Sequence, residues 1–330
     1  RAYFFHVPLI FIMGRVLTKK DVDKVVRWTI LLMIPMTVLM IMQFLSPQSS
    51  FVNMGIGGEG SSGFGGVDGK FRPSTMFSFT SGTVLFYSYA SACILYGVTQ
   101  GKLVSKFVLY ISGGCLMLAM PMSISRTLVM MVVIIFLMGY FGLYRTRKTR
   151  RFIPKIIITV CLLVLVTKNL PGMDDAINTF LIRWEQGAQK NKGGLEFSIG
   201  FRIMEWFTTP VEAIFKDSIV GGGIGMGTNV GAKLLTGEMG FLIAEIEWLK
   251  LIGELGAALG FCYIIFRSFL TFYLGRMSWW ALGEGNILPW LLFICNAMNV
   301  LMGNWGQATV LGFTCFVAGL NLAACQIYGE

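Results

Sequence analysis

Three arginines occupy positions where a guanidinium group could bind an anion. Arg126 lies in a short turn between apolar runs, "PMSISRTLVMM", and Arg72 precedes an apolar run in "GKFRPSTMFS". Arg202 opens the polar stretch "GFRIMEWFTTPVEAIFKDSIVGGGIGMG". A guanidinium at an apolar boundary is costly unless an anion pairs with it, and its planar fork matches phosphate. The alternatives are interfacial snorkelling for Arg126 and Arg72 and, for Arg202, an intrahelical ion pair with Glu205.

Carboxylates cluster in "AEIEWLKLIGELG" (244–256), where the polar stretch re-enters an apolar run. Glu245 could act as a general base or hold an acceptor hydroxyl, and Glu247 could contact the substrate beside it. Glu254 lies about two helical turns deeper in the apolar run. The alternative is that these carboxylates only satisfy the positive N-terminal end of the following helix.

The glycine cluster "GGGIGMG" (221–227) is only loosely similar to a phosphate-binding loop. It lacks the lysine of G-x-x-x-x-G-K-[ST], and no strand is expected before it. We therefore predict a tight backbone turn, in which Gly223 and Gly225 could let the chain approach a ligand closely.

The residues that commonly bind metals are too scattered to predict a metal site. All seven cysteines fall in apolar segments without C-x-x-C spacing, and His6 is the one histidine. We interpret the cysteines as small packing residues and predict neither a disulfide nor bound zinc.

The composition indicates an all-α polytopic membrane protein. Of the 330 residues, 55% are hydrophobic and 13% are charged, whereas a soluble domain carries about a quarter charged residues. Several continuous apolar runs approach the roughly 18–20 residues that a spanning helix needs. We predict nine transmembrane helices, over 3–16, 28–47, 75–99, 105–122, 126–144, 153–168, 248–275, 286–303 and 307–327.

Basic residues set the predicted orientation of these spans. The stretches "LTKKDVDKVVR" (17–27), 100–106 and "RTRKTRRFIPK" (145–155) share one side if the spans alternate, which makes that side cytoplasmic. Two long connections then lie outside, the Gly- and Ser-rich 48–74 and the partly helical 169–247.

The second outer connection has the pattern of a folded cap on the membrane surface. Its stretch "DDAINTFLIRWEQ" places Ile177, Leu181 and Trp184 on one face of an amphipathic helix. The chain thus divides into N-terminal transmembrane helices, the cap and C-terminal transmembrane helices, over 1–168, 169–247 and 248–330. Because the sequence starts at an arginine, we expect further N-terminal helices to precede it in a longer protein.

These motifs resemble the hallmark region of the O-antigen ligase and O-antigen polymerase superfamily of bacterial envelope glycosyltransferases. In that family a long periplasmic loop carries Arg-x-x-x-Trp, an amphipathic helix and a Gly-x-Gly turn, and the next span contains Glu-x-Gly. "GKFRPSTMF" and the Ser-Arg turn also match, and three predicted spans follow the large loop. The matching residues are Arg202, Trp206, Gly223, Gly225, Glu254, Gly256, Ser125 and Arg126.

One departure from the family pattern concerns the acceptor. Ligases usually carry a His-Asn pair nine residues before the glutamate of Glu-x-Gly, and this chain has Glu245 there. A polysaccharide polymerase, or a ligase-like enzyme with another lipid or protein acceptor, therefore fits better than a lipid A-core ligase.

The resemblance implies a GT-C-like architecture and glycosyl transfer at the periplasmic face of a bacterial inner membrane. The donor would be an undecaprenyl-pyrophosphate-linked glycan and the acceptor a sugar hydroxyl, with no metal and no cofactor. Arg126 and Arg202 would stabilise the leaving group and Glu245 would take the acceptor proton. The other expected substrate contacts are Arg72, Trp206, Gly223, Gly225 and Glu247. The implied partners, besides the lipid bilayer, are chain-length regulator and flippase proteins; nucleic acid is not expected.

Two other functions remain open at this point. A transporter or flippase of lipid-linked glycans would carry polar groups within its spans, and Asn296, Asn299 and Asn321 are the main ones here. A non-catalytic scaffold would not need arginines at the ends of its spans.

The predicted orientation can be tested with cysteines placed in the connections. Cysteines at Ser61 and Lys190 should react with a membrane-impermeant thiol reagent in intact spheroplasts, because both connections lie outside. A cysteine at Thr149 should react only after permeabilisation. The parent chain, whose cysteines all lie in apolar segments, is the control. The reverse labelling pattern would contradict the orientation.

Overall fold

The computed structural model describes residues 5–47, 49–53, 70, 72–101, 103–145, 172–189, 208, 221–237, 243 and 246–326. Within these ranges the chain is helical and contains no strand. The elements are α1 (Val7–Val16), α2 (Lys19–Leu45), η1 (Phe51–Asn53), α3 (Thr80–Gln100), α4 (Lys106–Met122), α5 (Arg126–Arg145), α7 (Met173–Gln189), α9 (Asn229–Thr236), α10 (Glu247–Gly283), α11 (Leu288–Met302) and α12 (Ala308–Gln326).

Five of the described helices are long and apolar enough to cross a membrane, namely α2, α3, α5, α10 and α12. They overlap five of the predicted spans. Three shorter apolar helices, α1, α4 and α11, overlap three more. The span predicted over 153–168 lies outside the described residues. Among the described residues the all-helical class is confirmed, as are five helices long and apolar enough to span a membrane, and the total of nine spans stays a prediction.

The helix α2 starts earlier than the span predicted over 28–47. Thr18 and Asp21 form a capping box, in which the Thr18 Oγ1 accepts from the Asp21 N–H at 3.4 Å and the Asp21 Oδ2 accepts from the Thr18 N–H at 3.0 Å. This reciprocal pair satisfies N–H groups that the first helical turn leaves without partners. The basic stretch 17–27, predicted as a connection, therefore forms mainly the first turns of α2.

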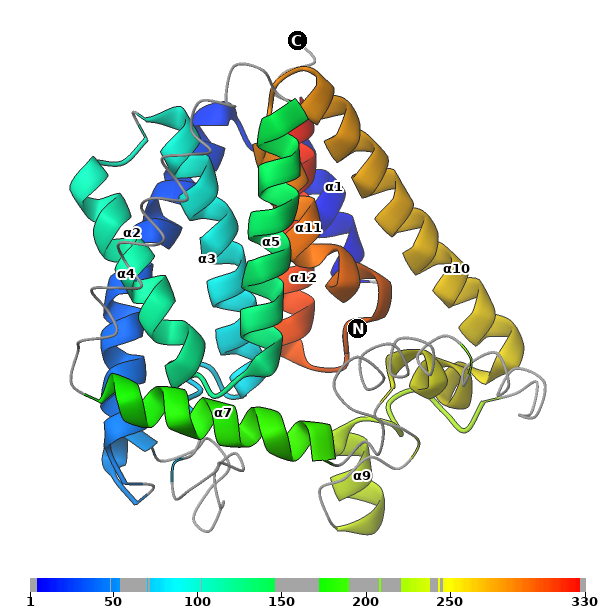
Figure 1. The fold of residues 1–330 in the computed structure, drawn as a ribbon. Helices are drawn as coiled ribbons and strands as arrows, with labels where there is room; N and C mark the ends of the chain where they lie inside the picture. The colour runs from blue at the N-terminus through cyan, green and yellow to red at the C-terminus, as the bar shows by residue number, and fades with distance from the viewer. Residues whose placement is uncertain are drawn as a thin grey trace.

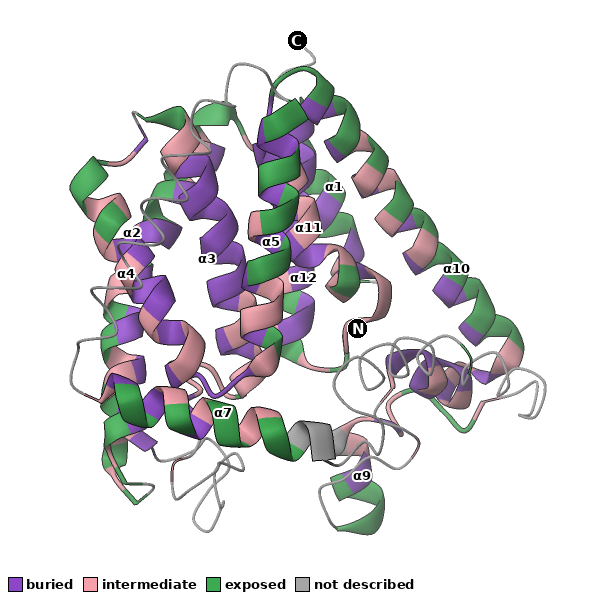
Figure 2. Cartoon of the chain, in the orientation of Figure 1, coloured by how far each residue is buried: buried purple, intermediate pink, exposed green. Residues whose placement is uncertain are grey.

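Helix α3 is the centre of the bundle. It packs against α2, α4, α5, α11 and α12, and side chains along nearly all of its length are buried (Figure 2). Buried hydroxyls join it to α2, since the Tyr87 hydroxyl lies 2.8 Å from the Thr37 hydroxyl and the Thr29 hydroxyl donates to the Tyr89 hydroxyl at 3.4 Å. Such interhelical hydrogen bonds hold helices together where water does not compete.

Helix α7 lies across the ends of the bundle helices, at the end opposite the C-terminus (Figure 1). It packs against α4 through the buried side chains of Met173, Ala176 and Thr179. The buried face of α7 is therefore rotated from the face predicted by Ile177, Leu181 and Trp184, because Leu181 is 50% exposed. The small side chains of Ala176 and Thr179 allow the close approach that a larger leucine would prevent.

Helix α10 folds back on itself at Gly256. Glu247 and Arg267 are twenty residues apart, yet their side chains form an ion pair at 3.2 Å. A continuous helix would hold them roughly 30 Å apart. Gly256 has φ 83° and ψ 166°, a conformation essentially confined to glycine. The span predicted over 248–275 is thus a short helical segment before Gly256, which we call the returning arm of α10 (247–255), followed by a long helix over 257–283.

The fold-back predicts that Gly256 tolerates no side chain. Gly256→Ala should lower the free energy of unfolding by about 1–3 kcal/mol, the usual cost of a strained backbone, measured as a lower melting temperature in detergent. Gly283→Ala is the matched control on the same helix, because a Cβ there meets no atom within 4 Å. Equal melting temperatures for both variants would contradict the fold-back.

Candidate functional site

Three arginines from separate parts of the chain come together at the end of the bundle where α7 lies. Arg72 belongs to the segment before α3, Arg126 is the first residue of α5, and Arg183 lies on α7. All three side chains are half-buried. Burial, followed by the charges of Arg183 and Arg126, lowers the pKa of Arg72 to about 10. Burial and the charge of Arg126 also lower the pKa of Arg183.

The guanidinium group of Arg72 also has an unmet hydrogen bond. Its Nε is buried and has no hydrogen-bond partner. A buried donor without a partner is unfavourable, and so is the approach of like charges. An anion bound among the three arginines would relieve both costs, since it would accept hydrogen bonds and neutralise charge.

Strained turns sit beside two of these arginines. Ile124, two residues before Arg126, has φ 48°, and Thr75, three residues after Arg72, has φ 54°. These are the described non-glycine residues with positive φ, and β-branched residues rarely adopt this conformation. Strain of this kind persists only where the surroundings enforce it, and it concentrates at functional sites.

The turn before Arg126 is fixed by local hydrogen bonds and burial. Ile124 is fully buried and donates its N–H to the Pro121 carbonyl at 3.0 Å. The Ser125 hydroxyl accepts from the Leu128 N–H at 3.4 Å at the start of α5. Arg126 is therefore the first residue of α5, at the helix N-terminus, where the helix dipole adds positive potential that favours an anion.

Sequence patterns identified two members of this cluster and missed the third. Arg72 and Arg126 were both candidates for anion binding, and each lies close enough to the other to affect the pKa of Arg72. Arg183 follows the buried Ala176 by seven residues, so it lies on the stripe of α7 that faces the bundle. That periodicity is the signal that could have found it. Arg202, Trp206 and Glu245 lie outside the described residues.

The glycine cluster forms a turn that docks against the returning arm of α10. The Gly222 N–H donates to the Gly253 carbonyl at 2.8 Å and the Gly223 N–H to the Glu254 carbonyl at 3.2 Å. The Gly227 N–H donates to the Glu254 carboxylate at 2.9 Å. These three amides are engaged within the protein, so they are not directed at a phosphate. The expected tight turn is present, with φ 118° at Gly223 and 100° at Gly225.

Glycine is required in this turn because the two backbones nearly touch. A Cβ at Gly221 would overlap the backbone of Glu254 and Gly256. The turn and the fold-back of α10 are therefore a single packing unit, which explains why the Gly-rich stretch and Glu-x-Gly occur together in this chain.

Glu247 belongs to a buried charge network and does not present a free carboxylate to a substrate. One carboxylate oxygen accepts from Arg267 at 3.2 Å and from the Trp305 N–H at 3.3 Å, and the other lies 3.5 Å from the Lys250 ammonium. Glu247 is 3% exposed. The substrate contact expected for Glu247 stays a prediction, and the contacts that the structure gives its carboxylate are internal.

Arg267 completes this network within the apolar bundle. It donates to the carbonyls of Val300, Asn299 and Gly303 at 2.8, 3.1 and 2.8 Å, and its guanidinium lies 4.2 Å from the ring centre of Trp305. A buried charge is tolerated only with this degree of pairing. The network therefore fixes the returning arm of α10 to the connection between α11 and α12.

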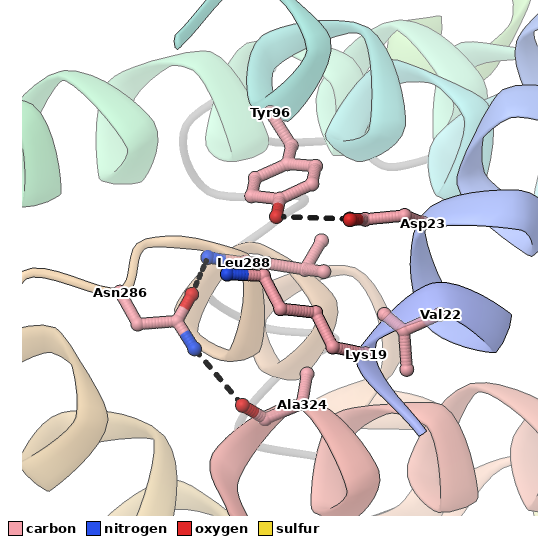
Figure 3. A pocket seen from close by; sticks show the side chains of 7 residues that line it. All are labelled: Lys19, Val22, Asp23, Tyr96, Asn286, Leu288 and Ala324. Atoms are coloured by element: carbon pink, nitrogen blue, oxygen red, sulfur yellow. Dashed lines mark hydrogen bonds between the residues drawn. The ribbon is translucent and has the colours of Figure 1, made fainter. Parts of the chain in front are cut away.

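A small pocket of about 10 Å³ lies at the other end of the bundle, among the start of α2 and the ends of α3 and α12 (Figure 3). The Tyr96 hydroxyl donates to Asp23 at 3.3 Å across it, and Asn286 donates to the Ala324 carbonyl at 2.9 Å. Ligand sites usually measure about 300–1,000 Å³. This pocket is too small for a glycan donor.

No family model, no curated protein and no solved structure matches this chain.

The arginine cluster predicts that inorganic pyrophosphate stabilises the protein. It should raise the melting temperature in detergent, because a ligand at a hundredfold excess over its Kd adds about 2.7 kcal/mol to the free energy of unfolding. Arg72→Met, Arg126→Met and Arg183→Met should each reduce this shift. Without pyrophosphate, Arg72→Met should not lower the melting temperature, because it removes a repelling charge with an unpaired donor.

Arg276→Met is the control for this experiment, because Arg276 is exposed on α10. It should keep the full shift with pyrophosphate. A shift of the same size in the control and in all three cluster variants would reject an anion site among Arg72, Arg126 and Arg183.

Proposed function

We propose that this protein transfers a glycan from a polyprenyl pyrophosphate to an acceptor sugar hydroxyl, at the outer face of a bacterial inner membrane. The reaction is of the polymerase type and elongates an O-antigen or exopolysaccharide. The observation that carries the proposal is the convergence of Arg72, Arg126 and Arg183 at one end of a bundle of apolar helices.

The position of the cluster suits a lipid-linked donor. The polyprenyl tail of such a donor stays in the bilayer, and its pyrophosphate lies at the membrane surface. A site for it must therefore join apolar helices to cationic groups at their ends. Arg126 at the start of α5 and Arg183 on the crossing helix α7 meet this requirement (Figure 1).

The chemistry requires stabilisation of a leaving group and removal of one proton. The acceptor hydroxyl oxygen forms a bond to the anomeric carbon, and the bond from that carbon to the pyrophosphate oxygen breaks. Negative charge grows on the departing pyrophosphate, where guanidinium groups can form bidentate hydrogen bonds. The proposal assigns the acceptor proton to Glu245 and a further pyrophosphate contact to Arg202, on the sequence motifs alone.

The carboxylate in place of the ligase histidine favours a polymerase over a lipid A-core ligase. In this scheme the growing glycan is the acceptor and the bilayer holds the donor. Flippase and chain-length regulator proteins would act before and beside the enzyme as partners.

Substitutions of Arg126, Arg202 and Glu245 should lower glycan transfer in a membrane assay with a lipid-linked oligosaccharide. Arg126→Ala and Arg202→Ala should each reduce turnover about a hundredfold, because each removes a donor whose bond strengthens in the transition state. Lysine at either position should rescue poorly, since it keeps the charge and loses the planar fork. Glu245→Gln should lower turnover more than donor binding.

Arg276→Ala serves as the control, and the membrane level of every variant must equal that of the parent. Normal long-chain polysaccharide in cells that carry only Arg126→Ala or only Arg202→Ala would reject the proposed site.

A further inference from the structure

We propose that Gln43 is a positioning residue for Arg72, on which it acts through the strained turn at Thr75. The inference rests on the pyrophosphate-binding role proposed above for the arginine cluster. Nothing in the sequence motifs points to Gln43, which lies in the last turn of α2 among apolar residues.

One buried amide side chain holds both backbone groups of the strained residue. The Gln43 Oε1 accepts from the Thr75 N–H at 2.8 Å, and the Gln43 Nε2 donates to the Thr75 carbonyl at 3.0 Å. The same Nε2 donates to the Val52 carbonyl at 3.0 Å. Gln43 is 6% exposed and Thr75 5% exposed, so water does not compete for these bonds.

The turn needs this support because of its backbone conformation. Thr75 has φ 54°, which crowds a β-branched side chain and is adopted only when the surroundings enforce it. The Thr75 hydroxyl also lies 3.1 Å from the Thr83 hydroxyl on α3. Gln43 and Thr83 thus hold the turn between two helices, and loss of the amide would let it relax.

The position of Arg72 is set mainly by this backbone. Pro73 follows it directly, which restricts Arg72 to extended conformations, and Pro73 is buried. The Nε of Arg72 makes no hydrogen bond, so that atom does not anchor the side chain. The turn at Thr75 is therefore the nearest fixed point that determines where the guanidinium lies relative to Arg126 and Arg183.

The end of α2 that carries Gln43 is itself anchored. The Asn53 side chain donates to the carbonyls of Gln43, Ser46 and Pro47, each at 3.0 Å. These carbonyls lack helical partners because the helix ends there. The backbone that carries Gln43 is consequently held in place by Asn53, as is required of a residue that positions another.

The test measures the Kd of inorganic pyrophosphate for the full chain in detergent by calorimetry. Gln43→Met removes the amide at similar size and should weaken binding about tenfold, equivalent to about 1.4 kcal/mol. Arg72→Ala should weaken binding too. The double variant Gln43→Met/Arg72→Ala should bind no more weakly than Arg72→Ala alone, because Gln43 acts only through Arg72.

Thr37→Val is the matched control, because it removes a buried hydrogen bond between α2 and α3 at 2.8 Å without touching the turn. It should lower the melting temperature and leave the Kd unchanged. If Gln43→Met does not fold, Gln43→Asn replaces it, since the shorter amide cannot hold both groups of Thr75.

A parental Kd for a folded Gln43 variant would overturn the inference. The inference would also be overturned if the double variant bound pyrophosphate more weakly than Arg72→Ala by the full factor seen for Gln43→Met alone. The effect of Gln43 would then not act through Arg72. Glycan transfer is measured on the same preparations. If Gln43 affects pyrophosphate binding through Arg72 but the protein transfers no glycan, this inference stands and the proposed function is rejected. If the protein transfers glycan but Gln43 does not affect pyrophosphate binding through Arg72, the proposed function stands and this inference is rejected.

Discussion

The buried guanidinium of Arg267 imposes the strictest condition on this fold. A charge inside an apolar bundle must be neutralised and its donors must find acceptors, since lipid offers neither. Glu247 supplies the negative charge, three carbonyls at and just after the end of α11 accept hydrogen bonds, and the Trp305 ring covers the cationic face. To bring Glu247 there, the chain must fold back at Gly256, and the fold-back in turn creates the surface on which the glycine turn docks.

The environment of the arginine cluster at the α7 end of the bundle is the opposite of that of Arg267. Arg267 is fully buried and satisfied, whereas Arg72, Arg126 and Arg183 lie half-buried with mutually unfavourable charges. The first arrangement holds a fold together. The second gathers positive charges around an Arg72 Nε that has no hydrogen-bond partner, and two strained turns lie beside it. This contrast separates a structural network from a candidate ligand site among the described residues.

The sequence was informative wherever a feature depended on local pattern. Continuous apolar runs located the spanning helices, and the absence of the P-loop lysine predicted a plain turn at 221–227. Contacts between side chains far apart in the sequence could not be predicted from local pattern. Nothing local indicates that Glu247 meets Arg267, so its carboxylate was expected at a substrate. Gln43 was missed for the same reason, because its partner Thr75 belongs to another segment and gains its importance from a backbone angle.

The fold-back at Gly256 also fixes a length of chain. Arg267 meets Glu247 only because a set number of residues separates each from the turn, and one residue inserted into the long arm would rotate Arg267 by about 100° around its helix. The guanidinium would then point away from its acceptors, and an unpaired guanidinium in an apolar surrounding is strongly unfavourable. Related sequences should therefore vary freely in composition along this interval while keeping its length constant, so that spacing rather than identity marks the element.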